Sequence, residues 1–143
     1  MSKTIAVTGV ASGIGAALAR ILSQRGHTVI GFDKNPAEQN VHQFIHLDLN
    51  DPSSITNAVK QCPSGLDGLC NNAGLPPRDG LEHTILQVNF IGTRAFTNAV
   101  ASKMAPGASL VNMASRAGHR WQENLSQIKQ LATLHTEAEL EDF

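Results

Sequence analysis

The feature that most constrains the fold of this chain is the glycine-rich segment Thr8–Gly15, TGVASGIG, which directly follows an apolar run over residues 4–7. A chain with this pattern leaves a strand, reverses tightly and enters a helix. A Cβ at Gly9 or Gly13 would strain the turn or hold a phosphate away from it, and one at Gly15 would push the helix off the sheet. The segment therefore predicts a strand, a glycine turn and a helix whose first N–H groups point at the pyrophosphate of a dinucleotide.

The residues after this turn have the spacing of an amphipathic helix. Ile14, Leu18, Ile21 and Leu22 fall on one helical face, and Gly26 can end the helix. The glycine cluster thus stands in the context that a nucleotide site requires.

A second predicted strand, 28–33, ends in Asp33, eighteen residues beyond Gly15. At about this separation a dinucleotide-binding unit places the carboxylate that accepts hydrogen bonds from the adenosine ribose. Asp33 therefore favours NAD over NADP, because a 2′-phosphate would bring negative charge against it, although Lys34 could offset part of the repulsion. In the alternative interpretation Asp33 only opens the turn over residues 33–36.

Strand and helix patterns alternate along the chain. Strands are predicted at 4–8, 28–33, 44–49, 66–71 and 109–114, and helices from residue 13, from Ser53 or Ser54, and over a long segment that contains Gly92 and that Pro106-Gly107 should end. This alternation indicates an α/β fold: a Rossmann-type doubly wound parallel sheet of five strands in the order 3-2-1-4-5, with a C-terminal helical tail.

The chain changes character after Gly118, so we expect a dinucleotide-binding domain over residues 1–118 and a helical extension over 119–143. Trp121, Leu125, Ile128 and Ala132 form one helical stripe. The stripe is expected to dock on the domain or on another chain; a mobile flap over the cofactor is the alternative.

Composition narrows the class of partner. The chain has 143 residues and a net charge of −1, which gives no electrostatic reason to bind nucleic acid or an anionic membrane, so a small-molecule partner is expected. No apolar stretch approaches the ~20 residues of a membrane span, and the predicted first strand leaves no room for a secretory signal, so we expect a cytoplasmic protein. Two differently placed cysteines predict no disulfide framework, and no metal site is predicted.

Four ordered motifs together resemble the short-chain dehydrogenase/reductase family, and the resemblance covers nearly the whole chain to Gly118. They are the turn Thr8–Gly15, the Asn71-Asn72-Ala73-Gly74 segment, Asn89-Phe90-Ile91-Gly92, and Leu110-Val111-Asn112-Met113-Ala114-Ser115 at the fifth strand. Within the family, the chain most resembles the branch of bacterial coniferyl-alcohol dehydrogenases and 3α-hydroxysteroid dehydrogenases.

The resemblance implies a role for each matching position. The residues implied to bind the cofactor are Gly9, Ser12, Gly13, Ile14 and Gly15 at the pyrophosphate, Asp33 at the adenosine ribose, Asp48 and Leu49 at the adenine, and Asn72, Ala73 and Gly74 at the other ribose. Asn89 matches the asparagine that holds a helix kink and a water of the proton relay, and Ser115 matches the serine that hydrogen-bonds the substrate oxygen. Without the family, Asp48 would be a strand-end acid, Asn89 a polar residue within a helix and Ser115 a turn former.

The family transfers a hydride between a carbinol carbon and a nicotinamide, while a tyrosine, supported by a lysine one helical turn later, carries the proton. This chain contains no tyrosine. Lys129 and His119 stand in no equivalent frame, so we expect the chain to stop in the insertion that the branch places between its serine and its tyrosine. We also expect the fifth strand to have an unpaired edge unless the tail or another chain covers it, and we predict association through that face, giving a homo-oligomer.

Two functions follow from these expectations. The first is the cofactor-binding part of an NAD-dependent alcohol dehydrogenase, inactive alone. The second is a non-catalytic nucleotide-binding or interaction module.

Overall fold

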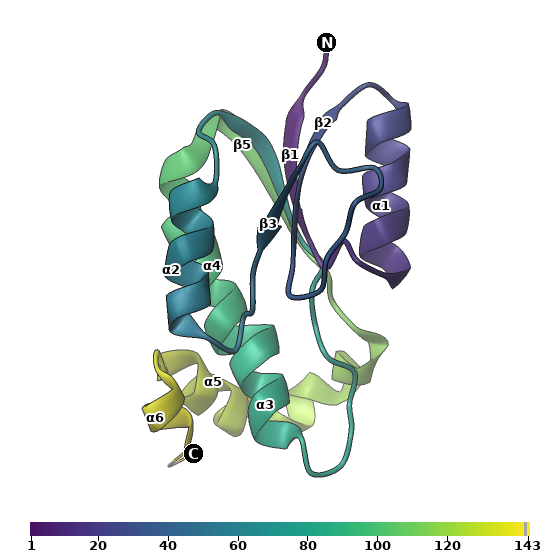
Figure 1. Cartoon of the computed structure of the whole chain (residues 1–143). Helices are drawn as coiled ribbons and strands as arrows, with labels where there is room; N and C mark the ends of the chain where they lie inside the picture. Colours follow the sequence, from purple (N-terminus) through teal and green to yellow (C-terminus); the bar gives the residue numbers. More distant parts are fainter. Residues whose placement is uncertain (142) are drawn as a thin grey trace.

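The computed structural model describes residues 1–141 and 143 and contains one parallel sheet with the strand order β3-β2-β1-β4-β5 (Figure 1). The strands are β1 (Thr4–Thr8), β2 (Thr28–Asp33), β3 (Gln43–His46), β4 (Leu66–Asn71) and β5 (Met104–Asn112). All neighbouring strands pair in parallel, so their carboxyl ends meet at one edge of the sheet. This confirms the predicted Rossmann-type fold and strand order.

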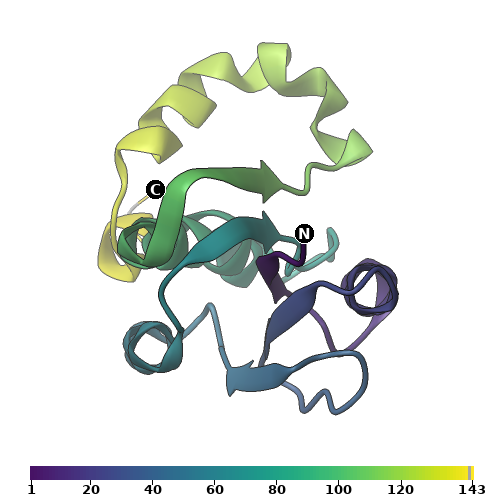
Figure 2. The same ribbon diagram turned by 90° about the horizontal axis from the view of Figure 1, so that it is seen from above.

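Helices cover both faces of the sheet (Figure 2). The helical elements are α1 (Gly13–Gln24), α2 (Pro52–Gln61), α3 (Glu82–Leu86), the π-helix η1 (Gln87–Gly92), α4 (Thr93–Val100), the 3₁₀-helices η2 (Ala101–Lys103) and η3 (Arg116–Asn124), α5 (Leu125–Thr133) and α6 (Glu137–Glu141). Helix α1 lies on one face, and α2 and α4 lie on the other.

The larger apolar core lies between the sheet and the α2–α4 layer. At its centre the rings of Phe32 and Phe96, both fully buried, meet edge to face with centroids 5.1 Å apart. Such aromatic pairs add about 0.5–1.5 kcal/mol beyond their area burial. The core therefore fixes β2, whose end carries Asp33, against α4.

Three boundaries differ from the prediction near the third strand, and the first is the start of β3, which lies at Gln43 instead of residue 44. Strand β3 ends at His46, because Asp48 turns the chain: its backbone N–H donates to Ser54 Oγ and its carboxylate accepts the N–H of Asn50, each at 2.9 Å. The next helix begins at Pro52 instead of Ser53 or Ser54, since Asp51 caps it by accepting the N–H of Ser53 at 2.8 Å.

The predicted long helix is three consecutive elements, α3, η1 and α4. At the end of the π-helix, a Cβ on Gly92 would lie 1.9 Å from the carbonyl oxygen of Leu49, so only glycine allows this approach. The hydroxyl of Thr93 donates to the carbonyl of Val88, five residues earlier, at 2.9 Å. The wide turn of the π-helix thus forms where Gly92 contacts the loop after β3. The apolar periodicity of the sequence did not predict this turn.

The prediction that Pro106-Gly107 ends this helix is wrong. Helix α4 ends at Val100 and η2 at Lys103, and β5 already begins at Met104. Pro106 and Gly107 lie in an irregular stretch of β5, where the pairing shifts register between Leu66 and Gly68. Gly107 has φ +80°, a conformation that suits such a bulge.

Strand β5 forms one edge of the sheet, and within the described residues no strand pairs with its outer side. The side chains of Leu110, Val111 and Met113 are about half exposed. The extension arches away from this edge and returns to the domain only at its far end (Figure 2). Within this chain the stripe does not dock on the domain along the arch, because Trp121, Leu125 and Ile128 are 39–50% exposed, and Phe143 is 44% exposed. Docking on another chain stays a prediction.

Within the described part of the chain, no helix is long and apolar enough to cross a membrane.

Candidate functional site

The glycine turn joins β1 to α1 through two left-handed residues, Gly9 at φ +77° and Gly13 at φ +55°. A Cβ on Gly9 would also lie 3.0 Å from the backbone of Ala73, whereas one on Gly13 would meet nothing within 4 Å. Gly13 is thus required for its conformation and Gly9 for both conformation and space. A Cβ on Gly15 would lie 2.0 Å from the carbonyl oxygen of Gly9, so this glycine lets helix α1 pack on the turn.

The N-terminus of α1 has free hydrogen-bonding capacity. Ser12 is the N-cap residue but its side chain makes no capping bond, and the first turn contains no acidic residue. The first N–H groups of a helix have no intrahelical partner and attract anions. This end of α1 can therefore bind a phosphate group.

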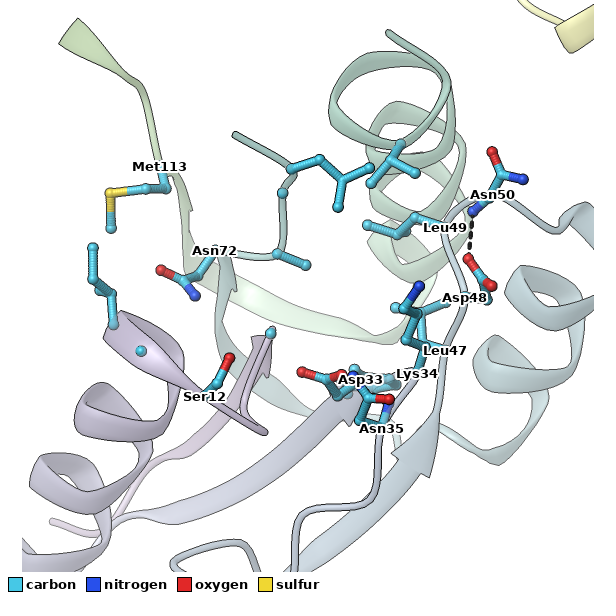
Figure 3. Close-up of a pocket in the computed structure, with 18 of the residues that line it drawn as sticks. Ser12, Asp33, Lys34, Asn35, Leu47, Asp48, Leu49, Asn50, Asn72 and Met113 are labelled. Atoms are coloured by element: carbon cyan, nitrogen blue, oxygen red, sulfur yellow. Dashed lines mark hydrogen bonds between the residues drawn. The ribbon is translucent and has the colours of Figure 1, made fainter. Parts of the chain in front are cut away.

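A cavity of about 500 Å³ opens beside this turn, at the carboxyl ends of β1, β2 and β4 (Figure 3). Of the eleven predicted cofactor-binding residues, the ten that line it are Gly9, Ser12, Gly13, Ile14, Asp33, Asp48, Leu49, Asn72, Ala73 and Gly74. Gly15 does not line the cavity, since it packs α1 against the turn. Residues from distant parts of the sequence thus meet around one space.

Asp33 is fixed at the end of β2 by two backbone donors. Its Oδ2 accepts the N–H of Ala11 at 3.0 Å, and its Oδ1 accepts the N–H of Asn35 at 2.9 Å. The second bond is the turn that the alternative interpretation proposed, yet the carboxylate still faces the cavity beside Lys34 (Figure 3). Each carboxylate oxygen has a second lone pair, so Asp33 can still accept ribose hydroxyls.

Thr8, which the sequence analysis treated only as the start of the motif, positions the opposite wall. Its buried hydroxyl accepts the N–H groups of Asn72 and Ala73 at 3.0 and 2.9 Å. The loop after β4 is thereby tied to β1. A hydroxyl at the end of an apolar strand was the only signal in the sequence for this contact.

The loop after β3 forms another wall of the first cavity, and it contains a buried leucine and an aspartate whose carboxylate bonds the backbone of the same loop. Leu49 is 5% exposed, and its carbonyl approaches Gly92 of the π-helix. The Asp48 carboxylate accepts the N–H of Asn50 and opens this turn (Figure 3). Leu47, Asn50 and Val88, which the sequence analysis did not select, line the same wall.

A second cavity, of about 800 Å³, lies between the ends of β4 and β5 and the helices η1 and α4. It contains both predicted catalytic residues, Asn89 and Ser115. The residues Asn72, Ala73, Gly74, Leu75 and Met113 line both cavities. The two spaces are therefore neighbours along one wall.

Asn89 in the π-helix holds the shared wall through both atoms of its amide. Its Oδ1 accepts the N–H of Leu75 at 2.7 Å, and its Nδ2 donates to the carbonyl of Leu75 at 2.9 Å. Ser115 lies three residues after β5, as the N-cap residue of η3, where its exposed hydroxyl accepts the N–H of Ala117 at 3.1 Å. The Ser115 hydroxyl can still donate to a ligand oxygen.

The floor of the second cavity is a hydrogen-bonded cluster. Asn71 Nδ2 donates to Thr97 Oγ1 and to Asn112 Oδ1, each at 2.8 Å, and ties β4 to α4 and β5. Among the described residues that line this cavity, the only charged side chain is Arg94, and there is no histidine, lysine or carboxylate. Ser115 thus has no neighbouring general base in that lining.

Neither cysteine has the features of a reactive thiol. Cys62 and Cys70 are free, and burial raises the pKa of both thiols, which keeps them protonated at neutral pH. Within the described residues no group of histidine, cysteine and acidic side chains could hold a metal ion.

Comparison with known proteins places this geometry in a family. The sequence profile described as "short chain dehydrogenase" matches residues 3–127. The coniferyl-alcohol dehydrogenase of Pseudomonas sp. (strain HR199 / DSM 7063) is 41% identical over 133 residues, which cover 93% of this chain and 52% of that protein. The 3-alpha-hydroxysteroid dehydrogenase/carbonyl reductase of Comamonas testosteroni is 29% identical over 124 residues, 84% of this chain and 48% of that protein.

A solved structure shows the same arrangement of the chain. The 3-alpha-hydroxysteroid dehydrogenase from Pseudomonas sp. B-0831, complexed with NADH, superposes with a TM-score of 0.79 at 31% identity, over 96% of this chain and 55% of that one. The chain thus spans about half the length of the relatives that it matches. With four motifs, a shared fold and a matching profile, this chain belongs to the short-chain dehydrogenase family.

Proposed function

We propose that this chain binds NAD(H) and supplies the cofactor site of an oxidoreductase that acts on an alcohol or the corresponding carbonyl compound. The observation that carries the proposal is the 500 Å³ cavity, which brings the glycine turn, Asp33 and Asn72–Gly74 together. The relatives named above are dehydrogenases of hydroxyl-bearing compounds, which supports the substrate class.

Different residues of the first cavity would bind different parts of the dinucleotide. The free N–H groups of α1 would hold the pyrophosphate, and Asp33 would accept hydrogen bonds from the adenosine ribose. The carboxylate of Asp33 also disfavours the 2′-phosphate of NADP through like charge. When bound, the nicotinamide supplies the hydride acceptor or donor.

In the second cavity, we assign Ser115 to hydrogen-bond the substrate oxygen and Asn89 to hold the wall beside the nicotinamide ribose. A positioned general acid or base contributes about 10²- to 10⁴-fold to a rate. Since the described lining offers no such group beside Ser115, we propose that this chain alone binds the cofactor without turnover.

A second candidate function is a nucleotide-binding module without catalysis. The same absence of a base beside Ser115 favours it. Binding experiments cannot separate the two functions, but sequence beyond residue 143 can: a Tyr-x-x-x-Lys segment there supports the dehydrogenase, and its absence supports the module.

Titration with NADH, followed by calorimetry and by quenching of Trp121, tests the shared part of both proposals. We expect saturable binding by the wild-type chain and by Gly118→Ala, because a Cβ at Gly118 meets nothing within 4 Å. Gly9→Val, whose side chain would meet Ala73, should abolish binding. A folded wild-type chain that shows no response at millimolar NADH would refute the proposal, and turnover of coniferyl alcohol by this chain would refute its inactivity.

We further propose that a second copy covers the exposed edge of β5. The half-exposed Leu110, Val111 and Met113 support this, because bare edges of this kind favour strand pairing. Sedimentation tests it: a dimer or larger species is expected, and a clean monomer in which β5 amides exchange freely would contradict it. The cytoplasmic location, the domain boundary at residue 118 and the individual roles of the site residues stay predictions.

A further inference from the structure

The chain from Ser115 onward, which includes the helical extension, begins and ends on the wall of the second cavity. At its start, Ser115 and Ala117 line that cavity, and at its far end the extension contacts Arg94, which lines the same cavity. Between these points every residue from 116 to 130 is exposed. Figure 2 shows this stretch as an arch that stands clear of β5. The extension is therefore a strap with two attachment points.

Arg94 makes the polar attachment at the far end. Its Nη1 donates to the carbonyl of Ala132 at 3.1 Å, and its Nη2 donates to the carbonyl of Leu134. These carbonyls lie at the C-terminal end of α5, which ends at Thr133, where backbone oxygens lack intrahelical partners. A cation there also opposes the partial negative charge of the helix end. Within the described chain, no other hydrogen bond joins the strap to residues before Ser115.

The guanidinium of Arg94 is itself held in place. It lies over the ring of Phe90, 4.6 Å from the centroid, a cation–π contact that fixes its plane. Phe90 belongs to the π-helix, one residue after Asn89. The rigid fork of arginine can serve two carbonyls at once, which the single ammonium of lysine does less well.

The apolar attachment beside Arg94 is small. Leu140 of α6 is 4% exposed and α6 packs on η1, whereas Leu131 and Leu134 are only partly buried. Neither apolar core of the domain includes any of the strap residues that the structure describes. The strap can therefore detach without opening the sheet, as segments with few buried contacts do.

We propose that Arg94 is the latch that holds the far end of the strap against the wall of the second cavity, and that its release frees the strap while the sheet stays folded. The latch is a positioning device for the strap, and it does not depend on which nucleotide the first cavity binds.

Hydrogen exchange measured by mass spectrometry tests the latch in Arg94→Ala, Arg94→Lys and a matched control, Arg20→Ala. Arg20 is exposed on α1, and among the described residues its guanidinium bonds Gln24 alone. In the wild type and the control we expect measurable protection of amides in α5 and α6. In Arg94→Ala these amides should exchange at least tenfold faster while β1 and β4 keep their protection, and Arg94→Lys should be intermediate.

Equal exchange of the strap in Arg94→Ala and the control would overturn the proposal, as would a wild-type strap without protection. If Arg94→Ala does not fold, Arg94→Lys decides. Faster exchange confined to the strap then supports the latch, and loosening of the sheet together with the strap contradicts it.

Discussion

At the residue scale, the glycines of the turn meet two different needs, backbone conformation and close packing. Gly13 meets no neighbour and is needed only for its positive φ, whereas Gly15 is needed only for space. The steric role of Gly15 could be predicted from the sequence, and the family resemblance also implied a place for Gly15 in the cofactor site. In the structure Gly15 packs the helix and does not line the cavity.

Gly15→Ala should therefore destabilise the fold. Its Cβ would lie 2.0 Å from the carbonyl oxygen of Gly9, and overpacking of this kind costs about 1–3 kcal/mol in the free energy of unfolding. Urea denaturation followed by circular dichroism measures the change. Gly118→Ala, at an open position, is the control and should stay near wild type; an unchanged midpoint in Gly15→Ala would contradict the steric account.

Asp33→Asn should change the choice of cofactor. Loss of the carboxylate removes charge-assisted hydrogen bonds to the ribose, worth about 1.5–3 kcal/mol each, so NADH should bind about tenfold more weakly or worse. The ratio of NADPH to NADH affinity should rise because the like charge is gone. Calorimetry with both cofactors measures this, with the exposed loop variant Asp79→Asn as control, and an unchanged ratio would exclude Asp33 as the selector.

At the element scale, α6 depends on a reciprocal cap. The Glu139 carboxylate accepts the N–H groups of His135 and Thr136 at 2.6 and 2.9 Å, while the Glu139 N–H donates to Thr136 Oγ1 at 3.2 Å. These backbone bonds hold the pKa of Glu139 below its ordinary value of 4.5. The cap therefore stabilises α6 fully above about pH 4.5 and less as the pH falls through the lowered pKa.

Acidification should thus unwind α6 before the sheet. Amide chemical shifts of Leu140 and its neighbours, followed by NMR as the pH falls below 4.5, measure this transition. Glu139→Gln should remove the pH dependence. A Leu140 amide that does not titrate in the wild type would contradict the role of the cap.

Elements whose boundaries depend on local pattern could be predicted from the sequence, and those set by distant contacts could not. Strands β1, β2 and β4 have the predicted bounds because apolar runs end in glycine or polar turns. The π-helix escaped prediction, since it forms where Gly92 meets the carbonyl of Leu49, more than forty residues earlier. The docking point of the extension was missed for the same reason: Arg94 carries no local signal for a helix end forty residues later.

At the scale of the whole molecule, the β5 edge of the sheet bears on both the proposed association of copies and the proposed lack of turnover. The first cavity is lined by the glycine turn and by the ends of β2 and β4, whereas the second borders the exposed segment after β5 and the strap. The candidate cofactor site could be predicted because its motifs lie at the ends of neighbouring parallel strands. The environment of Ser115 could not, because it depends on how β5 and the strap are covered.

The measurement that tests the central claim most directly is an amide NMR titration of the chain with NADH. Binding at the predicted site should shift the amides of Gly9, Ser12–Gly15 and Asn72–Gly74 in a saturable manner, while those of α2 and of the arch of the strap stay unchanged. A well-dispersed spectrum of a folded chain in which the glycine-turn amides do not move at millimolar NADH, or in which only distant amides move, would contradict the account.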